Sequence, residues 1–193
     1  MHSRSDDPVA VALQRAAALI ADDVRSIAAA NPVVVIDGRS GAGKTSLARL
    51  LVARWPVTGR VQLIALDSLY PGWDGLDAGA DRATDGILRP HARGLIGTWR
   101  RWDWELETDA ESHAVDPALG VIVEGCGILT PTTARLADVR VWVDAAEPVR
   151  KSRALMRDGD AYRPHWESWA VQEQRHIDRD DPRSLATRVI EIP

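Results

Sequence analysis

The sequence is poor in several residue types and patterns that mark particular classes of protein. Its 193 residues include a single cysteine, Cys126, so no disulfide can form within the chain. No apolar run approaches the length of a membrane span or the core of a secretory signal. The net charge of -4 supplies no general attraction for nucleic acid or an anionic membrane. We therefore expect a cytoplasmic protein whose partners are small molecules, with no nucleic acid and no membrane partner.

The histidines and cysteine also fail to form a recognisable metal site. The five histidines have no paired spacing, and one cysteine cannot build a zinc site. No G-x-S-x-G nucleophile turn is present. Phenylalanine is absent as well, and eight tryptophans supply the aromatic bulk, for which core packing is the simplest role.

One glycine-rich stretch carries the strongest signal in the chain. It matches the phosphate-binding pattern G-x-x-x-x-G-K-[ST] at every fixed position: Gly38, Arg39, Ser40, Gly41, Ala42, Gly43, Lys44 and Thr45. The apolar run 33–36 precedes it and a helical pattern beginning at Ser46 follows. Backbone amides of this loop, with the helix N-terminus, form an anion cradle. We expect these eight residues and Ser46 to bind the nucleotide, with Lys44 reaching the β- and γ-phosphates and the Thr45 hydroxyl bound to Mg2+.

Five apolar runs alternate with helical patterns, which is typical of a parallel sheet covered on both faces. The predicted strands are 33–37, 61–66, 120–125, 139–144 and 188–192. The sequence thus predicts an α/β, P-loop NTPase fold: a five-stranded parallel sheet with helices on both faces and a short lid at about 157–166. At this length we expect a single domain spanning 1–193, with an N-terminal amphipathic helix within 1–31.

The rest of the chain is less regular. We expect only a short helix at about 85–93, because glycines and Pro90 interrupt the pattern. Residues 98–104 favour an extended segment, and the polar residues 105–116 lead out of it. Thr130-Pro131 predicts the start of a helix. Further helices are expected at 148–158 and around Trp166 and Trp169.

Asp67, Glu124 and Asp144 all end predicted strands, at the edge where open α/β sheets bind ligands. Asp67 is the candidate general base, which would take the proton of a substrate hydroxyl. The alternative is a carboxylate that caps a turn or helix. Glu124 is the candidate carboxylate for Mg2+, through water; the alternative is an ordinary charge at a strand end.

Arginines gather near the predicted lid. Arg153 and Arg157 are four residues apart and share a helix face, and Arg163 follows the helix break. We expect Arg157 and Arg163 to cover the transferring phosphate and Arg153 to contact the nucleotide, unless this is simply a solvated basic face. Trp102, Asp103 and Trp104 combine stacking surface with charge, as an acceptor pocket would, although core packing explains the tryptophans equally well.

Several of these segments together resemble the uridine kinase-like branch of P-loop kinases, which includes phosphoribulokinase-like and pantothenate kinase-like enzymes. The similarity spans most of residues 33–192. Asp67-Ser68-Leu69-Tyr70 resembles the family's Asp-Ser-Phe-Tyr element, in which Asp is the base and Tyr contacts the acceptor. Residues 102–108 are similar to its Tyr-Asp-Phe-x-x-His-Thr segment, and Val123-Glu124-Gly125 to its Val-Glu-Gly strand end. The resemblance implies an acceptor contact for Tyr70 and lid positions for the arginines.

The chain also departs from this pattern. Glu107 stands where the nucleoside kinases of the branch use a histidine to help recognise the pyrimidine, and the lid is short, with Gly159-Asp160-Ala161-Tyr162. We expect an ATP- and Mg2+-dependent kinase acting on a hydroxyl of a small molecule, with a nucleoside-like acceptor favoured, as a monomer or homodimer. A kinase for a vitamin precursor, sugar or antibiotic is the nearer alternative. A nucleotide-dependent switch is disfavoured, because neither Asn-Lys-x-Asp nor Asp-x-x-Gly occurs.

Overall fold

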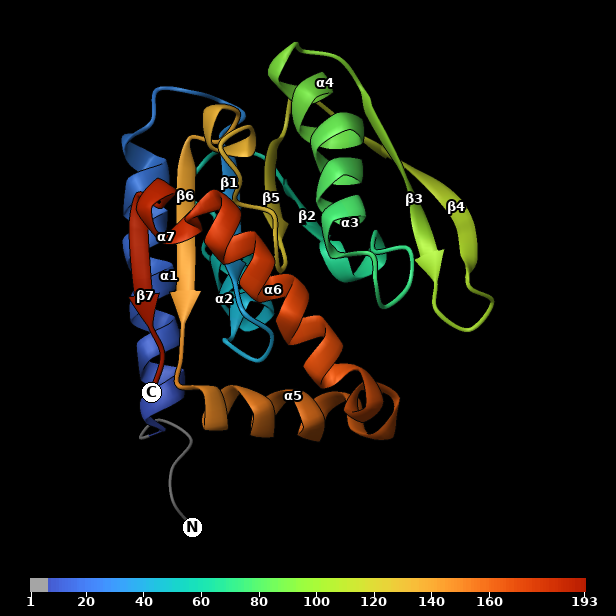
Figure 1. Cartoon of the computed structure of the whole chain (residues 1–193). Coiled ribbons are helices and arrows are strands. Elements are labelled where there is room, and N and C mark those ends of the chain that lie inside the picture. Colours follow the sequence, from blue (N-terminus) through green and yellow to red (C-terminus); the bar gives the residue numbers. More distant parts are fainter. Residues whose placement is uncertain (1–6) are drawn as a thin grey trace.

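Five parallel strands form the central sheet of the computed structural model, which describes residues 7–193. The order is β2-β5-β1-β6-β7, and every neighbouring pair is parallel. The bounds are β1 Val33–Gly38, β2 Val61–Ala65, β5 Gly120–Glu124, β6 Val139–Asp144 and β7 Arg188–Glu191. The predicted fold is confirmed (Figure 1). Residues 1–6, which belong to the predicted N-terminal segment 1–31, lie outside the described residues.

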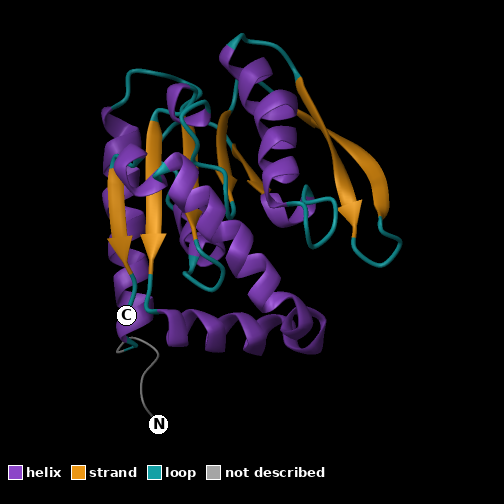
Figure 2. Cartoon of the chain, in the orientation of Figure 1, coloured by secondary structure: helices purple, strands orange, loops and turns teal. Residues whose placement is uncertain are grey.

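Helices cover both faces of this sheet, and β1 shows why (Figure 2). Its side chains alternate between two cores: Val33 and Val35 pack into one, Val34 and Ile36 into the other. The first core includes residues of α3 (Leu76–Ala83) and α6 (Trp166–Asp180); the second includes residues of α1 (Pro8–Ser26) and α2 (Lys44–Ala53). A strand buried on both faces has to be apolar throughout, which explains its continuous hydrophobic run.

The predicted amphipathic helix is α1. Asp7 caps its N-terminus by accepting a hydrogen bond from the Val9 amide at 3.0 Å, and Pro8 occupies the first turn. Of the helices within residues 7–193, none is both long and apolar enough to cross a membrane. The remaining elements are η2 Leu66–Ser68, η3 Thr84–Leu88, α4 Arg89–Ala92, β3 Gly97–Asp103, β4 Thr108–Val115, η4 Thr133–Arg135, α5 Glu147–Tyr162, η5 Arg163–His165 and α7 Pro182–Leu185.

The segment before the hairpin is more helical than predicted. Instead of a short helix at 85–93, helical structure runs from α3 through the π-helical segment η3 into α4. The glycines that suggested a break are packing positions: a Cβ on Gly79 would lie 2.4 Å from the Tyr70 ring, and one on Gly86 would lie 2.5 Å from the Thr98 carbonyl oxygen. These two positions are therefore glycine because neighbouring groups approach too closely for a Cβ, and not because the backbone needs to be flexible.

Two further expectations need correction. The polar segment 105–116 does not merely lead out of the extended stretch: β4 pairs antiparallel with β3 and forms a hairpin beside the main sheet. The helix predicted from Thr130-Pro131 is a single 3-10 turn, η4. Thr130 does act as a cap, since its Oγ1 accepts from the Thr133 amide at 3.2 Å, but the helix ends after this turn.

Helix α5 crosses below the carboxyl ends of the strands (Figure 1). It follows β6 directly, and it contains a kink at Gly159, where φ is 58° and ψ is -134°. The predicted break at this glycine is confirmed, because α5 (Glu147–Tyr162) consists of two helical segments that meet at the non-helical backbone of Gly159. Its two halves bound the space next to the strand ends.

Candidate active site

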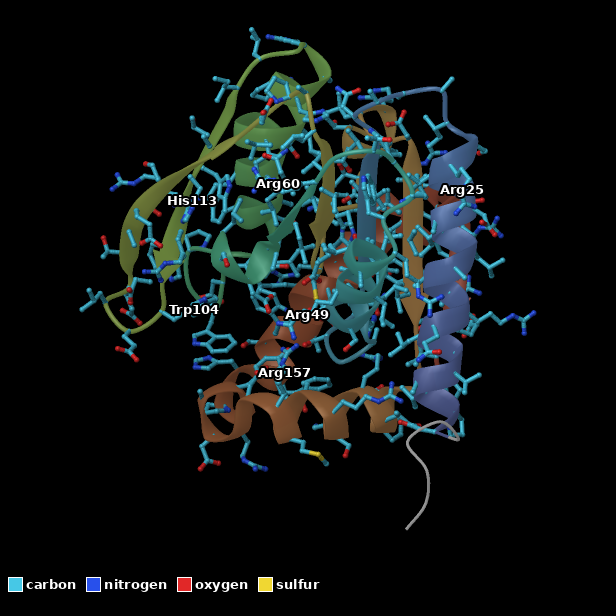
Figure 3. All side chains as sticks on the ribbon, turned by 180° about the vertical axis from the view of Figure 1, so that it is seen from behind. Arg25, Arg49, Arg60, Trp104, His113 and Arg157 are labelled. Atoms are coloured by element: carbon cyan, nitrogen blue, oxygen red, sulfur yellow. The ribbon has the colours of Figure 1, made fainter. Side chains whose placement is uncertain are left out.

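A cleft of about 600 Å³ opens at the carboxyl ends of the strands. Figure 3 shows three of its side chains, which come from α2 (Arg49), the β3–β4 hairpin loop (Trp104) and α5 (Arg157). The lining residues are Ser40, Gly41, Lys44, Thr45, Arg49, Ala65, Asp67, Tyr70, Trp73, Trp104, Glu105, Glu124, Cys126, Arg157, Asp158, Ala161, Tyr162 and Trp169. The cleft therefore unites the glycine-rich loop, two strand ends and the predicted lid.

The glycine-rich loop connects β1 to α2 and needs its glycines for geometric reasons. Gly43 caps α2 with a φ of 106°, a conformation that L side chains rarely adopt. Gly41 has a φ of 77°, and a Cβ there would lie 2.1 Å from the carbonyl oxygen of Arg150. Arg150 is itself buried and donates from Nη1 to the Ser40 carbonyl at 3.2 Å. The loop is thus locked against α5.

Lys44 is the buried cation of this loop. Its Nζ donates to the Arg39 carbonyl oxygen at 3.1 Å and lies 3.3 Å from Cys126 Sγ. Burial acts to lower the pKa of Lys44, but nearby acidic groups, Cys126 and Glu124 first among them, outweigh it, and the pKa is raised overall. The side chain is therefore a fixed positive charge at the base of the cleft.

Thr45 and Glu124 form a pair of oxygen donors beside Lys44. Thr45 Oγ1 donates to Glu124 Oε1 at 2.8 Å, and Glu124 is only 3% exposed. Burial raises the pKa of Glu124 despite the neighbouring Lys44. Within residues 7–193 no three His, Cys, Asp or Glu side chains cluster to hold a metal. A hydroxyl and a carboxylate nonetheless fit Mg2+, which takes oxygen ligands and is usually shared with phosphates.

Asp67 lies in the 3-10 turn η2 that follows β2, and it lines the cleft. Its backbone oxygen accepts a hydrogen bond from Trp104 Nε1 at 2.8 Å, which ties the turn to the hairpin. Among the described residues, no group donates a hydrogen bond to its carboxylate. The alternative role, a turn or helix cap, therefore finds no support in the contacts of this side chain.

The lid arginines are divided between the cleft and the surface. Arg157 lines the cleft and pairs with Asp158, with Nη2 to Oδ2 at 2.6 Å, and this contact raises the pKa of Arg157. Arg163 is exposed and pairs with Asp160 at 3.4 Å. Arg153 hydrogen-bonds the Pro193 carbonyl oxygen. Of these three arginines, only Arg157 lines the cleft.

A buried network lies behind the loop and joins it to α6. The Asp37 carboxylate accepts from the Gly38 amide at 2.6 Å, and its Oδ2 lies 3.0 Å from His176 Nε2. Glu173, also on α6, accepts from the Ser40 amide at 2.6 Å. Neither α6 residue was predicted as functional, because the sequence has no pattern that pairs them with the loop.

The sequence of this chain is similar to that of a known protein. No family model matches the chain. It is 28% identical over 144 residues to uridine kinase of Streptococcus mutans serotype c (strain ATCC 700610 / UA159), a match that covers 66% of this chain and 68% of that protein. The chain is therefore similar in sequence to a uridine kinase.

Solved structures support the uridine kinase-like fold. A Bacillus stearothermophilus protein described as a possible uridine kinase superposes with a TM-score of 0.67 at 18% identity, covering 92% of this chain and 98% of that one. A Silicibacter sp. TM1040 protein described as a candidate kinase of a fructose transport system gives a TM-score of 0.58 at 18% identity, covering 90% and 98%. At these identities the likeness concerns the fold.

Not every residue predicted for the site reaches the cleft. Tyr70 does, and its hydroxyl donates to the Cys126 carbonyl oxygen at 2.8 Å. Trp102 and Asp103 do not line it: the Trp102 ring lies under the Arg82 guanidinium at 5.7 Å, and Asp103 accepts from backbone amides of the hairpin turn. Trp104 takes the cleft position instead.

The residues that line the cleft without having been predicted include Arg49, Trp73, Tyr162 and Trp169. Arg49 is one turn after Thr45 on α2, so helical spacing could have placed it on the same face. Trp73 belongs to the loop after η2, and it stacks on Tyr162 with ring centroids 5.4 Å apart and on His165 at 4.3 Å. Trp169, on α6, is another aromatic residue that lines the cleft. No sequence signal pairs aromatic residues so far apart in the chain.

Proposed function

We propose that the protein is an ATP- and Mg2+-dependent kinase that phosphorylates a hydroxyl of a small, nucleoside-like molecule. The observation that carries this proposal is the convergence on one cleft of Lys44, the Thr45–Glu124 oxygen pair and the unpaired Asp67 carboxylate. These are the parts that phosphoryl transfer needs: a cation for the phosphates, metal ligands and an acceptor for a proton.

Each residue has a distinct role in this proposal. The amides of the loop from Gly38 to Ser46 and the Lys44 ammonium hold the β- and γ-phosphates, and Thr45 and Glu124 hold Mg2+, which neutralises charge on the phosphates when bound. Asp67 accepts the proton of the substrate hydroxyl as that oxygen attacks the γ-phosphorus, and the bond from this phosphorus to the β–γ bridging oxygen breaks, so that ADP leaves. Arg157 faces the phosphates from the lid. Arg163 joins it only if the lid moves inward, because in this structure it points to Asp160.

The acceptor is proposed to lie among Asp67, Tyr70 and Trp104. Aromatic faces beside a carboxylate suit a planar group attached to a sugar hydroxyl. Glu107 stands where the nucleoside kinases of the resembling family have a histidine that helps recognise the pyrimidine. It lies at the exposed hairpin turn and does not line the cleft, which favours an acceptor other than a pyrimidine nucleoside. Another small alcohol, such as a sugar or vitamin precursor, is therefore the second candidate.

An ADP-release screen over nucleosides, sugars and small alcohols tests the proposal. We expect acceptor-dependent ADP release from the wild-type protein. The Asp67→Asn variant should lose about two to four powers of ten in turnover while its ATP affinity stays nearly unchanged, as for loss of a general base. Asp22→Asn, on the outer face of α1 and 67% exposed, is the matched control and should keep full activity.

The same assay identifies the alternatives. Slow ADP release that no acceptor increases would indicate a nucleotide-dependent switch and contradict the kinase proposal. Turnover in Asp67→Asn equal to that of the wild type would remove Asp67 from the role of base.

A further inference from the structure

The part of the lid that follows the kink is built around one tyrosine. At Gly159 the backbone of α5 turns out of helical geometry, and no atom lies within 4 Å of where a Cβ would be, so nothing packs there. The helix then resumes and places Tyr162 in the cleft wall, where the residue is only 3% exposed.

The ring of Tyr162, and not its hydroxyl, fixes this position. It stacks on Trp73, with centroids 5.4 Å apart and planes 11° from parallel. It also meets the Trp166 ring edge to face at 5.6 Å. Two aromatic neighbours therefore orient the side chain, and a phenylalanine would pack in the same way.

The hydroxyl at the end of this ring is buried and has no hydrogen-bond partner among residues 7–193. The Ser40 side chain of the glycine-rich loop is near enough to act on the Tyr162 hydroxyl and to oppose the rise in its pKa. The two side chains nevertheless form no hydrogen bond of normal distance and angle. Buried polar groups almost always form a hydrogen bond, so an unpaired one indicates a partner that is absent from this structure. Burial raises the pKa of Tyr162 well above its ordinary value, and the O–H thus stays protonated and able to donate.

The missing partner is an acceptor that would sit between the lid and the loop. Ser40, Lys44 and Tyr162 all line the same cleft, and Lys44 carries a fixed positive charge. An anionic oxygen is the acceptor that such a cation and a free O–H donor would share. In a bound nucleoside triphosphate, the group that reaches from the loop toward the lid is the terminal phosphate.

We propose that the Tyr162 hydroxyl donates a hydrogen bond to the terminal phosphate of a bound nucleoside triphosphate, so that one atom of the lid distinguishes triphosphate from diphosphate. The inference rests on the proposed function and adds to it. The contact exists with the triphosphate and is lost when the phosphoryl group leaves. The lid then holds the substrate nucleotide more tightly than the product.

Nucleotide affinities of a Tyr162→Phe variant test this inference. Affinity for a non-hydrolysable ATP analogue with Mg2+ should fall about tenfold, the effect of one hydrogen bond to a charged group, while affinity for ADP stays within about twofold. The melting temperature should not fall, because the removed hydroxyl has no partner in the free protein. Met156→Leu, 83% exposed on the same helix, is the control and should bind both nucleotides normally. Equal losses for both nucleotides, or none for the analogue, would overturn the inference.

A second measurement uses the wild-type protein and does not depend on how the variant folds. The chain has only two tyrosines, so a protein with carbon-13-labelled tyrosine gives two ring Cζ signals, which Tyr162→Phe assigns. The Tyr162 signal should move with the ATP analogue and not with ADP. The same movement with both, or with neither, overturns the inference while leaving the kinase proposal standing. A wild-type protein that binds neither nucleotide overturns both.

Discussion

Replacing His176 with leucine should destabilise the protein by about 3–5 kcal/mol, the cost of breaking a buried charged pair. His176 Nε2 lies 3.0 Å from Asp37 Oδ2, Nδ1 lies 2.9 Å from Asp180 Oδ2, and the imidazole is 2% exposed. Hydrogen bonds to charged groups contribute about 1.5–3 kcal/mol each, so two of them reach this range. Asp37 would keep only its backbone donors, Gly38 among them.

The same contact gives stability a pH dependence of defined sign. Burial acts to lower the pKa of His176, but hydrogen bonds and the charges of Asp37 and Asp180 outweigh it, and the pKa is raised in the folded protein. A raised histidine pKa means that the fold binds the proton more tightly than the unfolded chain does. The stabilisation is therefore complete below about pH 6.5, the unfolded value, and is lost as pH rises through the folded pKa.

Urea denaturation of the wild type and His176→Leu, at several pH values from about 5.5 to 8.5, measures both effects. The difference in the free energy of unfolding should be largest at the acidic end and shrink toward the alkaline end. His113→Leu, on the hairpin with a side chain 42% exposed, is the control and should change stability by less than about 0.5 kcal/mol. A difference that is constant with pH, or grows as pH rises, would refute the argument that a protonated His176 joins α6 to the loop.

Two further changes address the loop itself. Gly41→Ala should weaken binding of Mg2+ and ATP by about tenfold or more, because its positive φ and the nearby Arg150 carbonyl oxygen force the loop to shift; calorimetric titration measures this, and normal affinity would contradict the packing argument. Glu173→Leu should lower the free energy of unfolding by about 1–3 kcal/mol, because the Ser40 amide loses its acceptor, whereas Glu173→Gln keeps an acceptor oxygen and should cost less. Equal losses in the two Glu173 variants, measured by urea denaturation, would speak against that bond.

The main sheet could be predicted from the sequence because its strands are buried on both faces and appear as apolar runs. The second strand of the hairpin, Thr108–Val115, could not, because most of its side chains are exposed and polar, and its pairing with β3 supplies the order. Helix α3 was missed for a different reason. Gly79 is conformationally unfavourable in a helix, and only the position of Tyr70 against it explains the choice.

Some residues of the site could be predicted from local sequence patterns, whereas others depend on contacts between distant segments. The phosphate loop is a contiguous motif, and strand ends place Asp67 and Glu124 at one edge of the sheet, so these positions follow from local pattern. The role of Trp104 in place of Trp102 depends on how the hairpin twists toward η2, which no single-sequence rule supplies. The same holds for Tyr162, whose packing on Trp73 joins segments about ninety residues apart.

A crystal structure of the protein with Mg2+ and a non-hydrolysable ATP analogue tests the central claim most directly. The account predicts that the β- and γ-phosphates lie in the loop against Lys44, with the metal beside Thr45 and the terminal phosphate facing the Asp67 carboxylate across the cleft. An empty loop, a nucleotide bound elsewhere, or an Asp67 side chain turned away from the terminal phosphate would contradict it.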